Sequence, residues 1–465
     1  MNPPPPRLDT RHALVAPHAL LPLGWASDVL LVWDAAGTLT GVTHGAAGIA
    51  GVPRAAGVVI PGMPNLHSHA FQRGFAGLTE YRGAGDDSFW SWRERMYRFA
   101  ALLTPEALED IATQLYIEML RAGYTSVCEF HYVHHQPDGA PHAEPAEMAL
   151  RIAAAARRAG IGLTLLPVLY QASGFGGRPP TAQQRRFVGD VDPLLRIVER
   201  LHAQDVRVGV APHSLRAVPP DALHRLVDGM HAMDPTAPVH IHVAEQQREI
   251  DDCLAWSGLR PVQWLLQHAA VDERWCLVHA THVDDAERAA LAACGATAGL
   301  CPSTEANLGD GVFPAAAYLD AGGRWGIGSD SHASVDAAGE LRLLEYTQRL
   351  QLQRRNVLAS PAEPQVAQRL WLAAVEGGAR ASGRPIGGLE AGQRADFVVL
   401  ADDATMQGLS PEQVLSSHVF ACQPERALRE VWVGGECRVR AGEHALGDEA
   451  SRRFVRARAQ LLRGT

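Results

Sequence analysis

The stretch Pro61-Gly-Met-Pro-Asn-Leu-His-Ser-His69 places two histidines directly after an apolar run at 58–61. His67 and His69 are two residues apart, so their side chains point to the same side of an extended backbone. Two imidazoles at one strand end can bind one metal ion. A lone His-x-His pair is weak evidence, because two polar loop residues produce the same pattern. Its meaning therefore depends on the rest of the chain.

Eight apolar runs alternate with helical stretches along the middle of the chain. One stretch is well delimited: Thr104-Pro105-Glu106 offers an N-cap, an N1 proline and an early acid, apolar periodicity continues to Arg121, and Gly123 suits a helix end. Eight strands with crossover helices predict an α/β fold, a (β/α)8 TIM-type barrel. An open doubly wound sheet is the alternative, weakened because no Gly-x-Gly-x-x-Gly motif follows the first strand. The runs are 58–61, 125–130, 162–169, 206–211, 239–243, 275–278, 296–300 and 325–327.

Both chain ends have a different texture, with short strands and turns. Strand patterns occur at 28–33, 394–400 and 430–435, and we expect the two ends to pair in one small β-sandwich domain. The expected organisation is residues 1–58 and 385–465 in this β-domain, the latter with a terminal helix, and residues 59–384 in a metal-dependent barrel.

Composition excludes several classes of function. The 465 residues carry a formal net charge of −9, and no lysine occurs, so all 42 basic residues are arginine. An acidic chain argues against a nucleic-acid or membrane-surface partner, and a lysine-bridged metal pair or Schiff base is impossible. Seven cysteines without a Cys-x-x-Cys pair favour a reducing cytoplasm over a disulfide framework.

Polar residues gather just after the apolar runs, which is the face of a barrel that carries active sites. His67 and His69 follow the first run, a histidine lies in the fifth, and Asp330 follows the eighth. Three imidazoles and a carboxylate suit Zn²⁺ or a similar divalent ion. His240 and His242 share a face of the fifth strand, and we place His240 one layer deeper, as a hydrogen-bonded interior residue.

These motifs resemble the amidohydrolase superfamily. Residues 61–69 resemble its metal-binding opening, His242-Val-Ala-Glu245, His279 and Ser329-Asp-Ser-His332 its mononuclear deaminase branch, and 387–396 its closing strand. The resemblance implies one divalent metal, most simply Zn²⁺ with Fe²⁺ or Mn²⁺ also tolerated, bound by His67, His69, His242 and Asp330. It also implies that Glu245, His279 and Asp330 are catalytic and that the substrate is held by Gln72, Arg93, Tyr132, His213 and Arg216.

Further stretches resemble the iminohydrolases of histidine degradation, namely those at 67–73, 89–97, 129–134, 213–216 and 345–350. This resemblance implies hydrolysis of N-formimidoyl-L-glutamate to N-formyl-L-glutamate and ammonia, by a cytoplasmic homodimer. Arginine can meet a carboxylate with two parallel hydrogen bonds, so Arg93 and Arg216 suit a dicarboxylate substrate. The alternatives are an aminohydrolase acting on a guanine-, cytosine- or triazine-type heterocycle, and a catalytically silent barrel serving as a scaffold.

Overall fold

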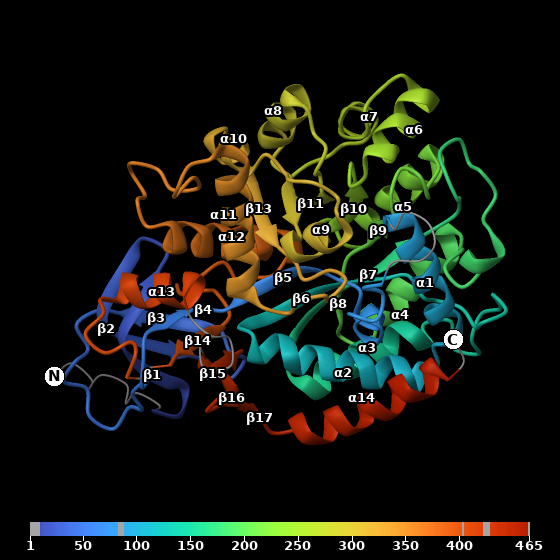
Figure 1. Ribbon diagram of the computed structural model, residues 1–465. Helices are drawn as coiled ribbons and strands as arrows, with labels where there is room; N and C mark the ends of the chain where they lie inside the picture. The colour runs from blue at the N-terminus through green and yellow to red at the C-terminus, as the bar shows by residue number, and fades with distance from the viewer. Residues whose placement is uncertain (1–9, 82–87, 402–403, 422–427, 464–465) are drawn as a thin grey trace.

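Two sheets of parallel strands occupy the middle of the molecule in the computed structural model, which describes residues 10–81, 88–401, 404–421 and 428–463 (Figure 1). Most of these strands are buried along their whole length, as expected for parallel strands covered by helices on their outer side. The first sheet contains β5 (Met63–Ser68), β6 (Tyr124–His131), β7 (Gly162–Leu169), β8 (Arg207–Val208) and β9 (Ala211–Pro212), the last paired with β7. The second contains β10 (Val239–Val243), β11 (Trp275–His279), β12 (Thr297–Leu300) and β13 (Arg324–Ile327).

Isolated parallel bridges join the two sheets at both junctions. Val210 pairs with Val239, and Ser214 pairs with His242, which links the end of the first sheet to β10. At the other junction Ser68, the last residue of β5, pairs with Asp330 just beyond β13. The bridges bring together the strand ends that carry the predicted metal ligands.

Helices follow most of the parallel strands. In α2, the Thr104 hydroxyl accepts a hydrogen bond from the Ala107 amide at 3.2 Å, and the helix ends at Arg121, which confirms the predicted helix and its cap. The α-helices are α1 (Phe89–Leu102), α2 (Pro105–Arg121), α3 (Glu147–Ala159), α4 (Val191–His202), α5 (Pro220–Met233), α6 (Gln247–Ser257), α7 (Pro261–His268), α8 (Asp285–Ala293), α9 (Pro302–Leu308), α10 (Ala315–Asp320), α11 (Ala337–Leu352), α12 (Val366–Ser382), α13 (Pro411–Phe420) and α14 (Gly447–Leu462).

Strands from both chain ends form a third, eight-stranded sheet, in the order β17-β16-β15-β14-β4-β1-β2-β3. Figure 1 shows the blue N-terminal and red C-terminal strands side by side, beside the parallel sheets. The expected pairing of the two ends is therefore present. The strands are β1 (Ala13–Leu21), β2 (Gly24–Trp33), β3 (Leu39–Thr43), β4 (Val59–Pro61), β14 (Phe397–Leu400), β15 (Leu428–Val433), β16 (Glu436–Arg440) and β17 (Glu443–His444). Residues 1–9 of the expected N-terminal region lie outside the described residues.

The apolar run at 58–61 belongs to this third sheet, and its assignment as the first parallel strand was wrong. It forms β4, which pairs parallel with β1 and antiparallel with β14. The first strand of the parallel sheets is β5. Gly62 separates them, and a Cβ there would lie 2.3 Å from the Thr125 side chain. A short, wholly buried run carries no period that distinguishes one sheet from the other.

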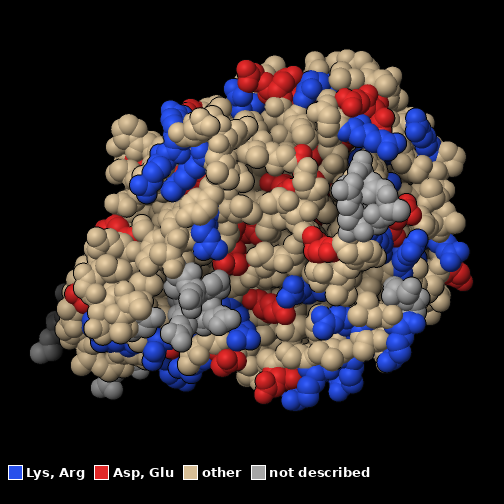
Figure 2. Space-filling model, in the orientation of Figure 1, with Lys and Arg blue, Asp and Glu red and all other residues tan. Residues whose placement is uncertain are grey.

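No helix within the described ranges combines the length and the apolarity that a membrane crossing requires. On the face drawn in Figure 2, arginine and acidic side chains are interspersed.

Candidate active site

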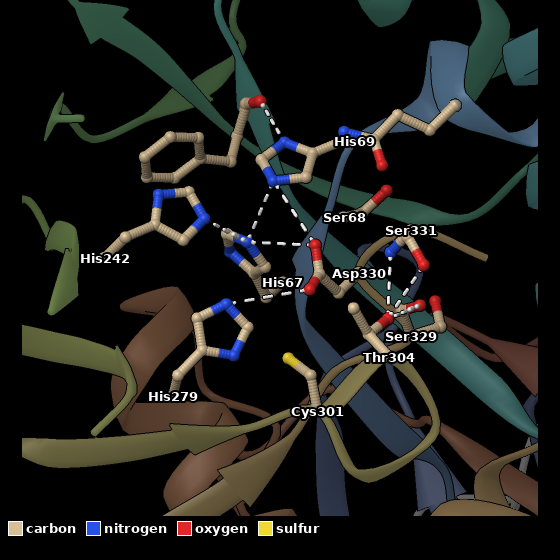
Figure 3. Close-up of polar contacts among 12 residues, drawn as sticks. His67, Ser68, His69, His242, His279, Cys301, Thr304, Ser329, Asp330 and Ser331 are labelled. Atoms are coloured by element: carbon tan, nitrogen blue, oxygen red, sulfur yellow. Dashed lines mark hydrogen bonds and ion pairs between the residues drawn. The ribbon is translucent and has the colours of Figure 1, made fainter. Parts of the chain in front are cut away.

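Three histidine side chains converge at the carboxyl ends of β5 and β10. The Nε2 atom of His67 lies 3.1 Å from Nε2 of His69 and 3.0 Å from Nε2 of His242. All three residues are buried, and Figure 3 shows their rings turned toward one another and toward Asp330. The His-x-His spacing thus acts as expected, because the two side chains reach the same point from one strand end.

Backbone carbonyls fix the tautomers of two of these rings. The Nδ1–H of His69 donates to the Phe130 carbonyl at 3.0 Å, and that of His242 donates to the His213 carbonyl at 3.0 Å. Their Nε2 atoms then carry lone pairs that face the centre of the cluster. Burial lowers the pKa of His69 to about 3 and holds the pKa values of His67 and His242 well below 6.5, so the imidazoles are neutral.

Asp330 completes this donor set from the end of β13. Its Oδ1 atom lies 3.3 Å from Nε2 of His69 and 3.5 Å from Nε2 of His67. Burial raises the pKa of Asp330 to about 7, and the charges of Glu245 and Glu305 act in the same direction against that of His279. Neutral imidazole nitrogens packed lone pair to lone pair repel one another, and a divalent cation between them and a carboxylate removes that conflict. The residues present therefore fit a metal ion.

His279, at the end of β11, lies between two carboxylates. Its Nε2 atom is 3.7 Å from Oδ2 of Asp330 and 3.7 Å from Oε1 of Glu245. On the other side of the ring, Nδ1 lies 3.3 Å from Oε1 of Glu305. Burial alone lowers the pKa of His279, but the charge of Glu245 and the hydrogen bond and charges of Glu305 and Asp330 outweigh it and raise the pKa to about 10. The ring is thus a cation with a proton on each nitrogen.

The sequence analysis did not identify Glu305 as a functional residue. It lies in α9, which begins directly after β12, and its Oε1 atom also accepts the Cys301 amide at 2.9 Å. The available signal was an acidic residue in the first turn of a helix that starts at a strand end with Pro302. That signal resembles ordinary helix capping, so it does not single out a partner for His279.

The five predicted substrate-binding residues line one cavity together with His69, His242 and Asp330 of the histidine–aspartate cluster. This cavity has a volume of about 60 Å³. Gln72 lies in the short helix η2 (Ala70–Gly74) just after His69, and its side-chain amide donates to the Tyr132 hydroxyl at 3.0 Å. The residues that line the cavity include Gln72, Arg93, Tyr132, His213 and Arg216 and also His69, His242, Glu245, His279 and Asp330.

Arg216 lies between two acidic side chains, one from the loop that precedes α6 and one from the first turn of α6. Its guanidinium is 3.8 Å from Oε2 of Glu245 and 3.8 Å from Oε2 of Glu249. Glu249 is fully buried in α6 and accepts the Glu245 amide at 3.2 Å. Sequence reasoning missed Glu249, because an acidic residue in the first turn of a helix is usually a solvated cap.

Left-handed backbone conformations cluster at these strand ends. Ala244, His279, Ala280, Asp330 and His332 have φ between +46° and +70°. Residues with a Cβ adopt this region at a cost, and such residues concentrate at functional sites. The sharp turns direct the side chains of His279 and Asp330 into the cavity. By contrast, His240 points away from the cluster and bonds the Ala381 carbonyl at 2.7 Å.

The comparisons with known proteins agree with this geometry. A model described as the amidohydrolase family matches residues 58–438. A formimidoylglutamate deiminase of Pseudomonas aeruginosa is 52% identical over 455 residues, covering 97% of this chain and 99% of the relative. An 8-oxoguanine deaminase of the same organism is 30% identical over 396 residues, covering 82% of each chain.

Solved structures give the same result for the fold. An amidohydrolase from Brucella melitensis is 50% identical, with a TM-score of 0.91, and the match covers 97% of this chain and 100% of that one. An adenosine deaminase from Xanthomonas campestris with bound zinc is 25% identical, with a TM-score of 0.78 and 96% and 98% coverage.

Proposed function

This chain belongs to the amidohydrolase family, and from that premise we propose that it hydrolyses N-formimidoyl-L-glutamate to N-formyl-L-glutamate and ammonia. The observation that carries the proposal is the composition of one cavity. His69, His242 and Asp330 of the cluster line it together with two arginines, Arg93 and Arg216, which suit the two carboxylates of the substrate. The 52% identity to a formimidoylglutamate deiminase over nearly the whole chain supports the same reaction.

His67, His69, His242 and Asp330 would hold one divalent metal, for which we propose Zn²⁺. When bound at such a site, this ion supplies Lewis acidity and lowers the pKa of a water molecule to about 7. Neutral nitrogen and carboxylate donors also suit Fe²⁺ and Mn²⁺. The zinc in the related adenosine deaminase supports the choice of Zn²⁺.

The chain's own residues handle the protons of the reaction. Water adds to the formimidoyl carbon, its oxygen stays on that carbon, and the terminal nitrogen leaves as ammonia. We assign Asp330 and Glu245 as the carboxylates that take up the two protons of the water and pass both to the terminal nitrogen, with Glu245 as the direct donor to that nitrogen, so that it leaves as NH3. His279, a cation 3.7 Å from a carboxylate oxygen of each, would stabilise the negative charge that develops at the attacked carbon's oxygen.

Arg93 and Arg216 would orient the substrate by its two carboxylates, with Tyr132, Gln72 and His213 as further hydrogen-bonding groups. Several aromatic side chains line the cavity, including Phe89, Trp92 and Tyr97, and their rings would exclude water from the polar contacts. A heterocycle lacks the carboxylates that two arginines would meet. The similarity to an 8-oxoguanine deaminase nevertheless makes a heterocyclic substrate the second candidate.

We also propose the finer features of the fold and assembly. The bridges at both sheet junctions support a closed (β/α)8 barrel within 59–384 that begins at β5, because β4 belongs to the third sheet. The ring centroids of Trp33 in β2 and Trp432 in β15 lie 5.8 Å apart, although three strands separate β2 from β15 in the sheet. This proximity supports a sheet folded into a β-sandwich from 1–58 and 385–465, with β4 added to the expected N-terminal part. A cytoplasmic homodimer stays a prediction from the family resemblance. Size-exclusion chromatography tests the dimer.

Ammonia release from a panel of substrates tests the proposed reaction. The panel contains N-formimidoyl-L-glutamate, N-formimidoyl-L-aspartate, guanine, cytosine and 8-oxoguanine at matched concentrations. We expect the highest kcat/KM for formimidoylglutamate. Preferred turnover of any heterocycle would overturn the assignment in favour of the second candidate.

A further inference from the structure

A second and larger cavity adjoins the one that contains the metal cluster. Its volume is about 310 Å³, and it shares Arg93 and Arg216 with the inner cavity. We call it the outer cavity. Two further arginines, Arg178 and Arg248, line it and are exposed to solvent. The full lining is Trp90, Arg93, Ser173, Gly174, Phe175, Arg178, Arg216, Arg248, Asp252, Ala255 and Trp256.

Arginines outnumber acidic residues in the lining of the outer cavity, in a chain of net charge −9, although Arg216 is paired at 3.8 Å with Glu245 and Glu249. Four arginines line it against one acidic residue, Asp252, which lies 3.6 Å from Arg248. Within the described residues, no carboxylate lies in ion-pair range of Arg93 or Arg178. The Nε atom of Arg93 is buried without a hydrogen-bond partner in that same part of the chain. The N–H groups of these two arginines are therefore available to an anion bound in the outer cavity.

Trp90 organises the guanidinium groups around itself. The guanidinium carbon of Arg93 lies 4.5 Å from the Trp90 ring centroid, that of Arg248 4.7 Å and that of Arg216 5.9 Å. These arginines come from α1, α6 and the segment after β9, so one indole ring contacts guanidinium groups from three parts of the chain. A guanidinium over an aromatic face keeps its charge and its N–H groups available for a carboxylate.

We propose that the outer cavity is an anion subsite that captures a dicarboxylate and passes it to the inner cavity, with Arg178 and Arg248 as its solvent-facing cations. The identity of the dicarboxylate as the substrate rests on the proposed function. A cleft lined by one sign of charge concentrates oppositely charged ligands and raises their association rate. The shared residues Arg93 and Arg216 give the captured anion a continuous path of arginines into the inner cavity.

Stopped-flow tryptophan fluorescence with glutarate, a dicarboxylate without the formimidoyl group, tests the subsite. The test variant is Arg178→Gln with Arg248→Gln, and the matched control is Arg225→Gln with Arg380→Gln. The control removes the same charge from exposed, ion-paired arginines of α5 and α12, and Arg225 and Arg248 have side chains that are 61% and 62% exposed.

We expect the test variant to lower the association rate constant of glutarate about tenfold at low ionic strength, with little change in the dissociation rate constant. At about 0.5 M salt, where surface charges are screened, the difference should disappear. The control should match the wild type. An association rate unaffected by the test substitutions would overturn the proposal, as would the absence of glutarate binding to the wild type.

Steady-state kinetics with formimidoylglutamate separates this proposal from the proposed function. We expect the test variant to lose kcat/KM about tenfold at low salt while kcat stays constant. If the wild type released no ammonia from this substrate but glutarate association still depended on Arg178 and Arg248, the reaction assignment would fall and the anion subsite would stand.

Discussion

His279 and Glu305 form a buried pair in which Nδ1 of the imidazole lies 3.3 Å from Oε1 of the carboxylate. The pair joins the end of β11 to the first turn of α9. Since the Nδ1 proton is held by Glu305, the Nε2 proton faces the space between Glu245 and Asp330. The orientation and the charge of His279 therefore both depend on a residue that does not line the cavity.

Glu305→Gln should lower kcat about 10- to 100-fold with a smaller effect on KM, because the carboxylate that orients His279 and sustains its charge is lost. Without it the pKa of His279 falls toward 6.5, so the basic limb of the kcat–pH profile should move to lower pH. Steady-state kinetics over pH measures both effects. A variant with unchanged kcat and pH profile would assign Glu305 a purely structural role at the start of α9.

Asp330→Asn should nearly abolish turnover while the fold stays intact, because the change removes the proposed metal ligand and proton acceptor together. Ammonia release measures the loss, and circular dichroism with thermal melting monitors the fold. Wild-type turnover in a folded Asp330→Asn protein would refute the role given to this residue.

Arg216→Met should raise KM at least about tenfold, since it removes the proposed charged contact to a substrate carboxylate. It should also lower the free energy of unfolding by about 3 kcal/mol, because Glu249 would stay buried without its cation. Adding Glu249→Leu should restore stability without restoring KM. If the double variant recovered both, the effect of Arg216 on KM would come from the fold and not from substrate contact.

Acid should destabilise the metal-free protein between pH 6.5 and about 4. Burial lowers the pKa values of His134 and His418 to about 4, below the unfolded value of 6.5. The unfolded chain therefore binds protons before the folded chain does as pH falls. The contribution of these histidines to the free energy of unfolding is complete above pH 6.5. Below that pH it falls by about 1.4 kcal/mol per pH unit for each group.

Denaturant unfolding of the chelated protein at several pH values measures this slope. His418→Gln should reduce it by about 1.4 kcal/mol per pH unit over that range, since one of the depressed histidines is gone. An identical slope in the variant would mean that His418 does not contribute.

The sequence predicted most strand and helix positions, because their signals are local. The apolar runs and the Thr104-Pro105-Glu106 cap each depend on a few neighbouring residues. The run at 58–61 was assigned to the wrong sheet, since only its partners, β1 and β14, distinguish it from β5. The run at 206–211 proved to be two short strands, β8 and β9, separated by a close contact at Gly209, where a Cβ would lie 2.3 Å from the Pro238 carbonyl oxygen.

The site could be anticipated where motif residues lie in the histidine–aspartate cluster or line the cavity. Glu305 and Glu249 were not anticipated, since each acts on another side chain and not on the cavity itself. Their contacts to His279 and Arg216 cross 26 and 33 residues of sequence, and an acid near a helix start has the same sequence signal whether it caps the helix or pairs with a buried cation.

Metal content of the purified protein tests the central claim most directly, because every proposed step needs His67, His69, His242 and Asp330 to share one ion. Elemental analysis by mass spectrometry should find about one equivalent of divalent metal per chain, zinc in the first place. Removal by a chelator should abolish ammonia release, and added Zn²⁺ should restore it. A protein that carries no metal after purification and turns over formimidoylglutamate equally well in the presence of chelator would contradict the account.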